Sequence, residues 1–284
     1  MWNCCHGLHQ DFMSGRPLGT LEARCPHYIS SMREVRQNEA ALVSAQMWRL
    51  FLGLIDSQGA SSQSTVTTTR TSGESYKAFE AEMTSQFQSS PIAPLFARVT
   101  DSLLHCYLRE YVSGADLSIQ RGNEFLGGLP NQSIGMWDMC ARGLCLYIAA
   151  QTTGKWRYIG HARKVRKTIE KWRRQGNPNV RHHTALLAAE DFVFQKKNEE
   201  ARRSYESSIL AASRGGFIHD AAVANERYAI CLMNDLNDKE SARFHLGAAD
   251  RLYREWGAYA VADGLEQLRL SLNTDGGSTT ECAV

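Results

Sequence analysis

The stretch from Arg214 to Gly257 constrains the fold of this chain more than any other. It contains two amphipathic patterns joined by a short polar turn, and glycines mark both of its ends. Small, aromatic and leucine residues recur in it at helical spacing: Ala224, Tyr228, Ala229, Leu232 and Met233, then Ala242, Leu246, Ala249, Leu252 and Tyr253. Small residues let two helices approach closely where they cross, and the larger ones fill the gaps between turns. The stretch therefore predicts a helical hairpin.

Similar patterns cover most of the 284 residues, and the chain has only six prolines to interrupt them. Besides the hairpin, helices are predicted over 1–12, 18–56 with a break near Pro26, 75–88, 91–112, 115–126, 131–153, 155–175, 179–197, 198–214 and 259–270. Short turns between successive helices favour antiparallel neighbours.

A weak repeat runs through the second half of the chain. In three successive hairpins a small residue follows an apolar or small one by twelve positions: Ala150 and Ala162, Ala189 and Ala201, and Ile230 and Ala242. The second members lie 39 and 41 residues apart, whereas tetratricopeptide repeats have a period of about 34 residues. We therefore predict an all-α fold, a tetratricopeptide-like α-solenoid of antiparallel helical hairpins with longer helices.

The predicted domain organisation is simple. Residues 1–271 form one helical repeat domain, and residues 272–284 form a disordered tail. Within the domain, residues 57–74 are rich in serine and threonine and poor in apolar groups, so we expect a flexible loop there.

Composition indicates the compartment. Four of the eight cysteines, Cys106, Cys140, Cys145 and Cys231, lie inside apolar helical patterns, where a free thiol behaves as a small hydrophobe. The N-terminus has no apolar core of a secretory signal, and no apolar run approaches the roughly 20 residues of a membrane span. We expect reduced thiols, a cytoplasmic location and no membrane association.

Residues 213–258, from Ser-Arg-Gly-Gly-Phe-Ile-His-Asp to Arg-Glu-Trp-Gly-Ala, resemble the end of the helical repeat region in large signalling proteins. These are the predicted ATPase and hybrid sensor histidine kinase proteins of cyanobacteria, fungi and some algae. Residues 12–22 and 176–180 are similar to earlier parts of that region, so the resemblance spans about residues 1–270. It implies a helical segment that couples an ATPase module to a sensor and a kinase. The family's ATP-binding and kinase residues lie outside the matched span, so those activities do not carry over.

Motifs for chemistry are weak. Gly154-Lys155 is followed by Trp156, so it does not form a phosphate loop, and no kinase or hydrolase motif is present. Zinc-capable residues near the N-terminus contain no Cys-x-x-Cys pair: Cys4, Cys5, His6, His9, Cys25 and His27. His182 and His183 are adjacent on a predicted helix, so their imidazoles should point apart. Asp220 is expected to complement a helix N-terminus. The sequence predicts no catalytic residue, no metal and no cofactor.

The most distinctive candidate site is a basic helix. Nine cations crowd residues 155–174 with Glu170 as the only acid: Lys155, Arg157, Arg163, Lys164, Arg166, Lys167, Lys171, Arg173 and Arg174. The interleaved apolar residues, Trp156 among them, are expected to form the buried face. The cations then form a solvated face, a surface for an acidic protein partner or neighbouring domain, or, less in keeping with the net charge of +2, a nucleic-acid contact.

These patterns predict a non-enzymatic protein-interaction or signal-relay scaffold. Its partner would be a peptide or a neighbouring signalling domain, held on the concave surface of the helical array. The alternative is a fragment of a larger ATP-dependent multidomain signalling kinase.

Overall fold

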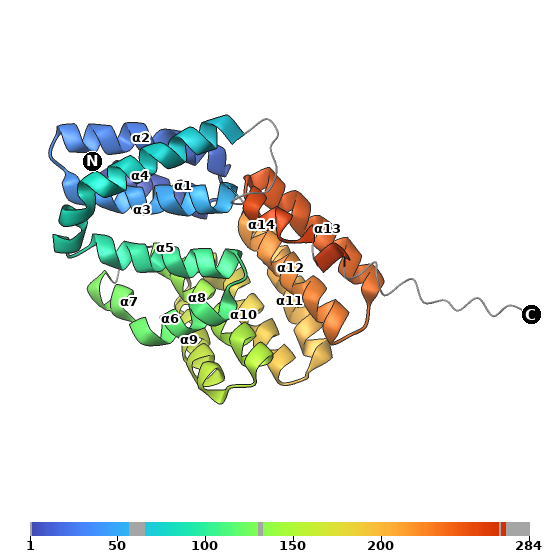
Figure 1. The fold of residues 1–284 in the computed structure, drawn as a ribbon. Coiled ribbons are helices and arrows are strands. Elements are labelled where there is room, and N and C mark those ends of the chain that lie inside the picture. The colour runs from blue at the N-terminus through green and yellow to red at the C-terminus, as the bar shows by residue number, and fades with distance from the viewer. Residues whose placement is uncertain (1, 57–65, 130–132, 267, 271–284) are drawn as a thin grey trace, which may run out of the picture.

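The computed structural model describes residues 2–56, 66–129, 133–266 and 268–270. These residues form helices and no strand, which confirms the predicted all-α class. The elements are α1 (Trp2–Met13), α2 (Leu18–Glu34), α3 (Asn38–Ile55), α4 (Val66–Ser89), α5 (Ala93–Tyr107), α6 (Tyr111–Arg121), α7 (Glu124–Gly128), α8 (Ile134–Thr153), α9 (Trp156–Arg174), the 3-10 helix η1 (Pro178–Val180), α10 (Arg181–Phe194), α11 (Asn198–Gly215), α12 (Ile218–Asn234), α13 (Lys239–Trp256) and α14 (Tyr259–Asp263) (Figure 1). Within the described parts of the chain, no helix is long and apolar enough to cross a membrane.

Helices end at a recurring turn that contains one left-handed residue. At the end of α11, Gly216 has φ of 74°, and the N–H of Phe217 donates to the carbonyl of Ala212 at 3.0 Å. This bond closes a Schellman motif, in which glycine meets no steric penalty. The prediction that glycine marks the start of the Arg214–Gly257 stretch is thus confirmed. The same left-handed turn is made by Arg36 and Lys196, which is why the sequence did not mark every helix end with glycine.

Several predicted boundaries are wrong. The turn expected between the helices 91–112 and 115–126 falls at 108–110, between α5 and α6, and the second of these helices is interrupted between α6 and α7. The break expected near Pro26 falls at Arg36, and α2 runs through the proline. Proline removes one helical N–H, but the buried face of α2 keeps the helix continuous on both sides. The predicted loop 57–74 is too long, because α4 begins at Val66. Residues 57–65 and the predicted tail 272–284 lie outside the described residues.

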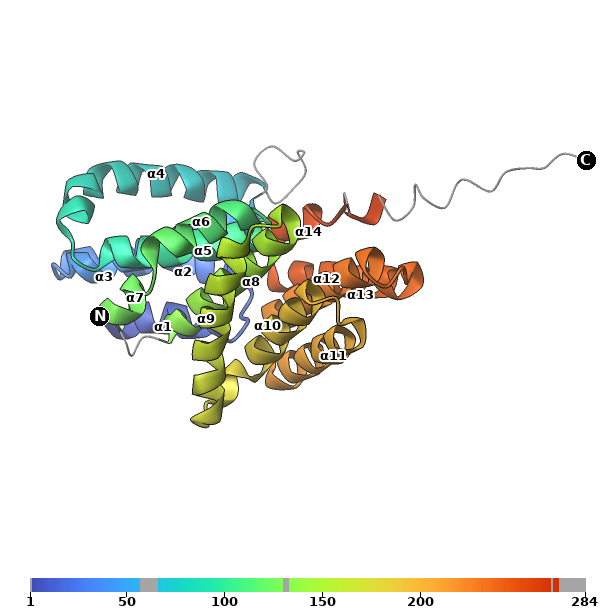
Figure 2. The ribbon, with the colours of Figure 1, turned by 90° about the horizontal axis from the view of Figure 1, so that it is seen from below.

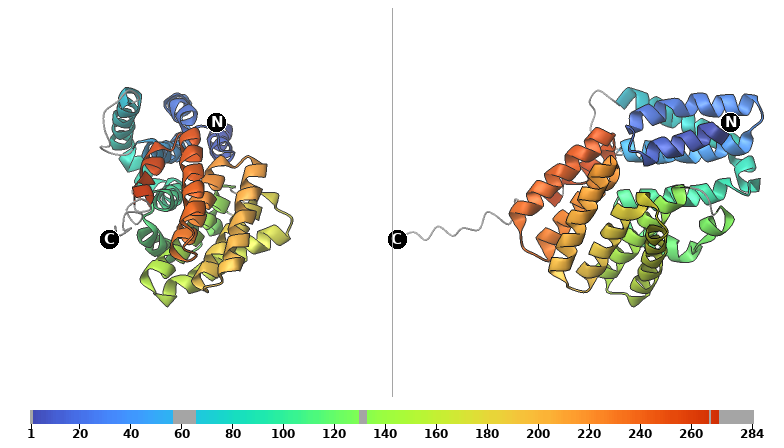
Figure 3. Two further views of the ribbon diagram at one scale, coloured as in Figure 1. Left: turned by 90° about the vertical axis from the view of Figure 1, so that its right-hand side faces the viewer. Right: turned by 180° about the vertical axis from the view of Figure 1, so that it is seen from behind.

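Three hairpins form the C-terminal half of the fold. They are α8 with α9, α10 with α11, and α12 with α13, and α10 packs between α8 and α12 (Figures 1 and 3). The small residues predicted at the crossings, Ala162, Ala201 and Ala242, are fully buried. The hairpins pair as expected, while their tetratricopeptide-like stacking stays a prediction.

The N-terminal helices form a second group. α3 packs against α1, α2, α4 and α5, and Figure 2 shows α4 at the outer edge of this group. α5 contacts both α3 and α8, so it joins the two groups. The core is continuous across all of them.

The last hairpin packs back onto the N-terminal helices. Trp256, at the end of α13, is fully buried among the rings of Phe12, Tyr107 and His219, with centroid distances of 5.5, 5.4 and 5.0 Å. α14 then contacts α3. The chain's own N-terminal helices therefore contact the end of the last hairpin.

Candidate functional site

Helix α9 carries all of the predicted site residues except Lys155, which immediately precedes it. The helix forms because apolar residues recur at intervals of three or four along one face: Tyr158, Ile159, Ala162, Val165 and Ile169 are all buried. This face packs against α8 and α10. Trp156 departs from the prediction, because 73% of its surface is exposed, and its ring packs edge-on against that of Phe194 at a centroid distance of 5.9 Å.

Five of the nine cations are paired with carboxylates. Arg157 pairs with Asp116 of α6. Arg163 and Arg166 share Asp191 of α10, at 3.1 and 3.3 Å. Arg173 and Arg174 both bind Glu170 within α9, at 2.7 and 3.0 Å. Hydrogen bonding by Arg173, followed by Arg174, lowers the pKa of Glu170 to about 2, so this carboxylate stays ionised at neutral pH.

The four lysines of this segment, unlike its arginines, form no ion pairs with other described residues. Lys155, Lys164, Lys167 and Lys171 are exposed, and none of them forms an ion pair within the described residues. Three of them lie at positions i, i+3 and i+7 and therefore form one stripe along α9, which we call the lysine stripe: Lys164, Lys167 and Lys171.

A groove borders the lysine stripe. Its volume is about 780 Å³, and it lies between the second half of α9 and the start of α10. Its lining consists of Arg166, Lys167, Glu170, Lys171, Arg174, Gln175, Thr184 and Ala188. The long aliphatic stems of the lysines and arginines can cover an apolar ligand surface here while their charged ends remain in water.

The charge of this surface is local. Nine cations and one acid give residues 155–174 a formal charge of +8, whereas the whole chain has +2, which leaves −6 for the rest. The field of α9 is therefore opposite in sign to that of the remaining chain, and acidic groups of a partner would be attracted to α9 specifically.

A second opening lies where α8, α10 and α12 end. It has a volume of about 480 Å³, and Gln151, Lys196, Asn234 and Asp235 are among its lining residues. Beside it, the buried Glu190 accepts hydrogen bonds from Arg227 at 2.7 and 3.1 Å, from Tyr205 at 2.9 Å and from Gln151 at 3.0 Å. These bonds cross-link three hairpins, and both charges are satisfied, so the network is structural.

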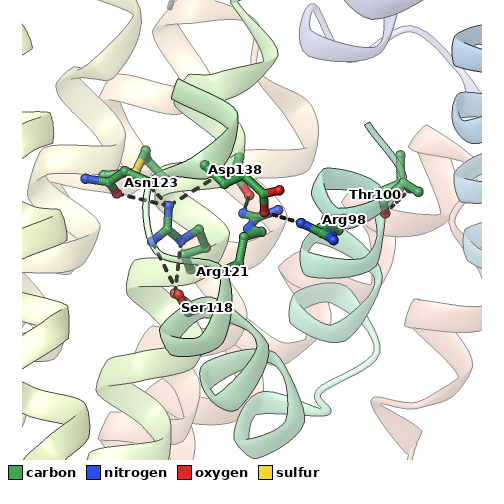
Figure 4. A network of polar contacts seen from close by, with 10 residues as sticks. Arg98, Thr100, Ser118, Arg121, Asn123 and Asp138 are labelled. Atoms are coloured by element: carbon green, nitrogen blue, oxygen red, sulfur yellow. Dashed lines mark hydrogen bonds and ion pairs between the residues drawn. The ribbon is translucent and has the colours of Figure 1, made fainter. Parts of the chain in front are cut away.

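A second buried network ties α6 to α8. Asp138 of α8 pairs with Arg121 of α6, and Arg142 approaches the same carboxylate at 3.8 Å (Figure 4). Arg142 also donates to the Ser118 hydroxyl at 2.9 Å. Burial lowers the pKa of Arg142, although Asp138 opposes that effect. Sequence reasoning missed this network, since its members lie in different helices without a motif.

A buried His–Asp cluster was also missed. His182, His183 and Asp220 lie together, and the prediction that the two imidazoles point apart is wrong, because their ring centroids are 4.0 Å apart. Burial, together with His182, lowers the pKa of His183 to about 3, so this imidazole is neutral at pH 7. Burial opposes ionisation of Asp220, but the surrounding histidines hold its pKa well below its usual range.

Comparison of the chain with protein-family models, with curated proteins and with solved structures returns no match.

Proposed function

We propose that this chain is a non-enzymatic protein-interaction scaffold that binds an acidic segment of a protein partner along the lysine stripe of α9. The observation that supports this proposal is a row of three exposed lysines, without acidic partners among the described residues, beside an open groove. Like charges three or four residues apart on a helix repel one another, so a bound acidic ligand would reduce the electrostatic repulsion among these lysines.

The dimensions suit a short segment. The lysine stripe and the groove beside it together extend from Lys164 to Arg174, over which the helix rises by about 15 Å, at about 1.5 Å per residue. An extended peptide covers that length with about five residues, at about 3.3 Å each. An acidic segment with three or four carboxylates can therefore meet every cation of the stripe.

Protein is favoured over nucleic acid as the partner. A nucleic-acid surface needs cations spread over several phosphates, whereas the remainder of this chain has a formal charge of −6 and would repel a long polyanion. The resemblance of residues 213–258 to the repeat region of signalling ATPases and histidine kinases supports a relay role. In that form of the proposal, the acidic partner is a neighbouring domain.

The test is peptide binding measured by fluorescence anisotropy over a salt series. The probe is a labelled ten-residue peptide of alternating glutamate and alanine, and the variant is Lys164→Glu/Lys167→Glu/Lys171→Glu. The matched control, Lys77→Glu/Lys197→Glu/Arg203→Glu, makes the same change in net charge on other exposed surfaces. We expect at least tenfold weaker binding by the stripe variant, wild-type-like binding by the control, and weaker binding of every protein at high salt.

Equal binding by the stripe variant and the wild-type protein contradicts the assignment to α9. Tighter binding of duplex DNA than of the acidic peptide, at the same salt concentration, contradicts the assignment to a protein partner.

A further inference from the structure

The His–Asp cluster joins two neighbouring hairpins. His182 and His183 are in the first turn of α10, and Asp220 is in the first turn of α12. All three residues are buried, with exposed fractions of 2%, 1% and 7%. Both imidazoles turn to the same carboxylate, which lies 38 residues after His182 and 37 after His183.

The distances suit a metal ion. His182 Nε2 lies 2.8 Å from Asp220 Oδ2, and His183 Nε2 lies 3.8 Å from the same oxygen. The three candidate ligand atoms lie within 4.8 Å of one another. Tetrahedral Zn²⁺, with bonds of about 2.0–2.2 Å, holds its ligand atoms roughly 3.3–3.6 Å apart. Small side-chain rotations therefore bring all three atoms onto one ion.

His183 supplies an independent observation that points to a ligand. Neither of its ring nitrogens has a hydrogen-bond partner, although both are buried. Buried polar atoms are nearly always satisfied, and leaving one without a partner costs about 1–3 kcal/mol. Coordination by one nitrogen would remove part of this deficit without moving the backbone.

The surroundings hold the ligands in place. Phe217 stacks on His182 at a centroid distance of 4.6 Å, and Trp137 packs edge-on against His183 at 5.2 Å. The indole of Trp137 donates to Nε2 of His219 at 3.1 Å. Because an indole N–H only donates, the lone pair of His219 Nε2 is occupied by this hydrogen bond. His219 therefore packs beside the cluster and is not one of the proposed ligands.

A fourth position is available beside the three ligands. A cavity of about 20 Å³ is lined by His183, Asp220 and the buried Cys140, among others. This volume holds one water molecule, and the Cys140 thiolate is the other candidate for the position. Two imidazoles and a carboxylate, with water or a thiolate, form a donor set that suits Zn²⁺ among the common divalent ions.

We propose that His182, His183 and Asp220 bind one Zn²⁺ ion that fastens α10 to α12. The site is buried on all sides, so the ion is structural and takes no substrate. This inference is independent of the lysine stripe, because the cluster is buried between α10 and α12 and includes no residue of α9.

The test uses the full chain, stripped with a chelator and then titrated with Zn²⁺ and, separately, Co²⁺. We expect one equivalent of Zn²⁺ by elemental analysis and visible Co²⁺ absorption bands of four-coordinate intensity. At a free Zn²⁺ concentration of about 100 times Kd, Tm should rise by roughly 5–10 °C. The variants His183→Gln and Asp220→Asn should bind at least about 100-fold more weakly, since even outer-shell changes cost 10–100-fold. His161→Gln, at an exposed histidine of α9, is the matched control and should bind like the wild-type protein.

Two results would overturn the proposal. One is a folded wild-type chain that takes up less than about a tenth of an equivalent of either metal, in which case the cluster is a buried ion pair only. The other is unchanged binding by a folded His183→Gln or Asp220→Asn variant. Circular dichroism establishes folding in each case, and the wild-type Co²⁺ spectrum decides the question even if both variants fail to fold.

Discussion

Replacing Glu190 by glutamine tests whether the buried network holds the three hairpins together. Glu190 is fully buried and faces Arg227, which is itself 5% exposed, at 2.7 and 3.1 Å. The substitution keeps the volume but removes the negative charge, and it points an amide donor toward a guanidinium that only donates. Arg227 is then a buried charge without a counter-ion.

The expected loss is large. Breaking a buried ion pair by changing one partner costs about 3–5 kcal/mol of the free energy of unfolding. The carboxylate also accepts from Tyr205 at 2.9 Å and from Gln151 at 3.0 Å, and Gln at 190 satisfies at most part of these bonds. We therefore expect a loss of about 4 kcal/mol.

The measurement is urea unfolding followed by circular dichroism at 222 nm, with the m-value checked for each variant. The double variant Glu190→Met/Arg227→Met removes both charges, so it should be more stable than Glu190→Gln despite two changes. The control is Glu206→Gln, at an exposed glutamate of α11 that accepts one bond from Tyr228, and it should lose less than about 1 kcal/mol. A loss below about 1 kcal/mol for Glu190→Gln would refute the reasoning.

Two further predictions concern the N-terminal helices. Trp256→Ala should lower the free energy of unfolding by about 3–5 kcal/mol, because the indole ring fills the space between Phe12 and Tyr107. Urea unfolding measures this loss. A loss below about 1 kcal/mol would mean that the last hairpin does not depend on this contact. Burial, followed by the charge of His6, lowers the pKa of His9 from 6.5 to about 3. The unfolded chain therefore binds more protons than the folded chain, and the free energy of unfolding falls as pH falls from about 6.5 to 3. His9→Leu should reduce that slope by up to about 1.4 kcal/mol per pH unit between pH 6 and 4, and an unchanged slope would contradict the assignment.

Local patterns predicted much of the fold. The positions of α8 to α13 follow from apolar spacing, and glycine marks the ends of α8, α11 and α13. Where non-glycine residues take the left-handed turn, as Arg36 does, the sequence signal was absent and the boundary was misplaced at Pro26. The start of α4 was missed because its first turns are rich in serine and threonine, and its regular apolar spacing comes only later, at Tyr76, Phe79 and Met83.

The candidate site divides in the same way. Helical spacing alone places eight of the nine cations on one helix and Lys164, Lys167 and Lys171 in one stripe. The pairing of Arg157, Arg163 and Arg166 could not be predicted, because Asp116 and Asp191 come from α6 and α10, and their positions depend on how those helices pack.

The helical hairpin at Arg214–Gly257 shows both sides of this division. Its two helices and its glycine ends follow from the sequence by itself, because helix formation depends on contacts three or four residues apart. Only the tertiary structure decided that Trp256 packs against the N-terminal helices and that Asp220 meets His182 and His183. Those contacts join residues separated by tens to hundreds of positions, and their geometry arises from the packing of whole helices, which no local pattern records.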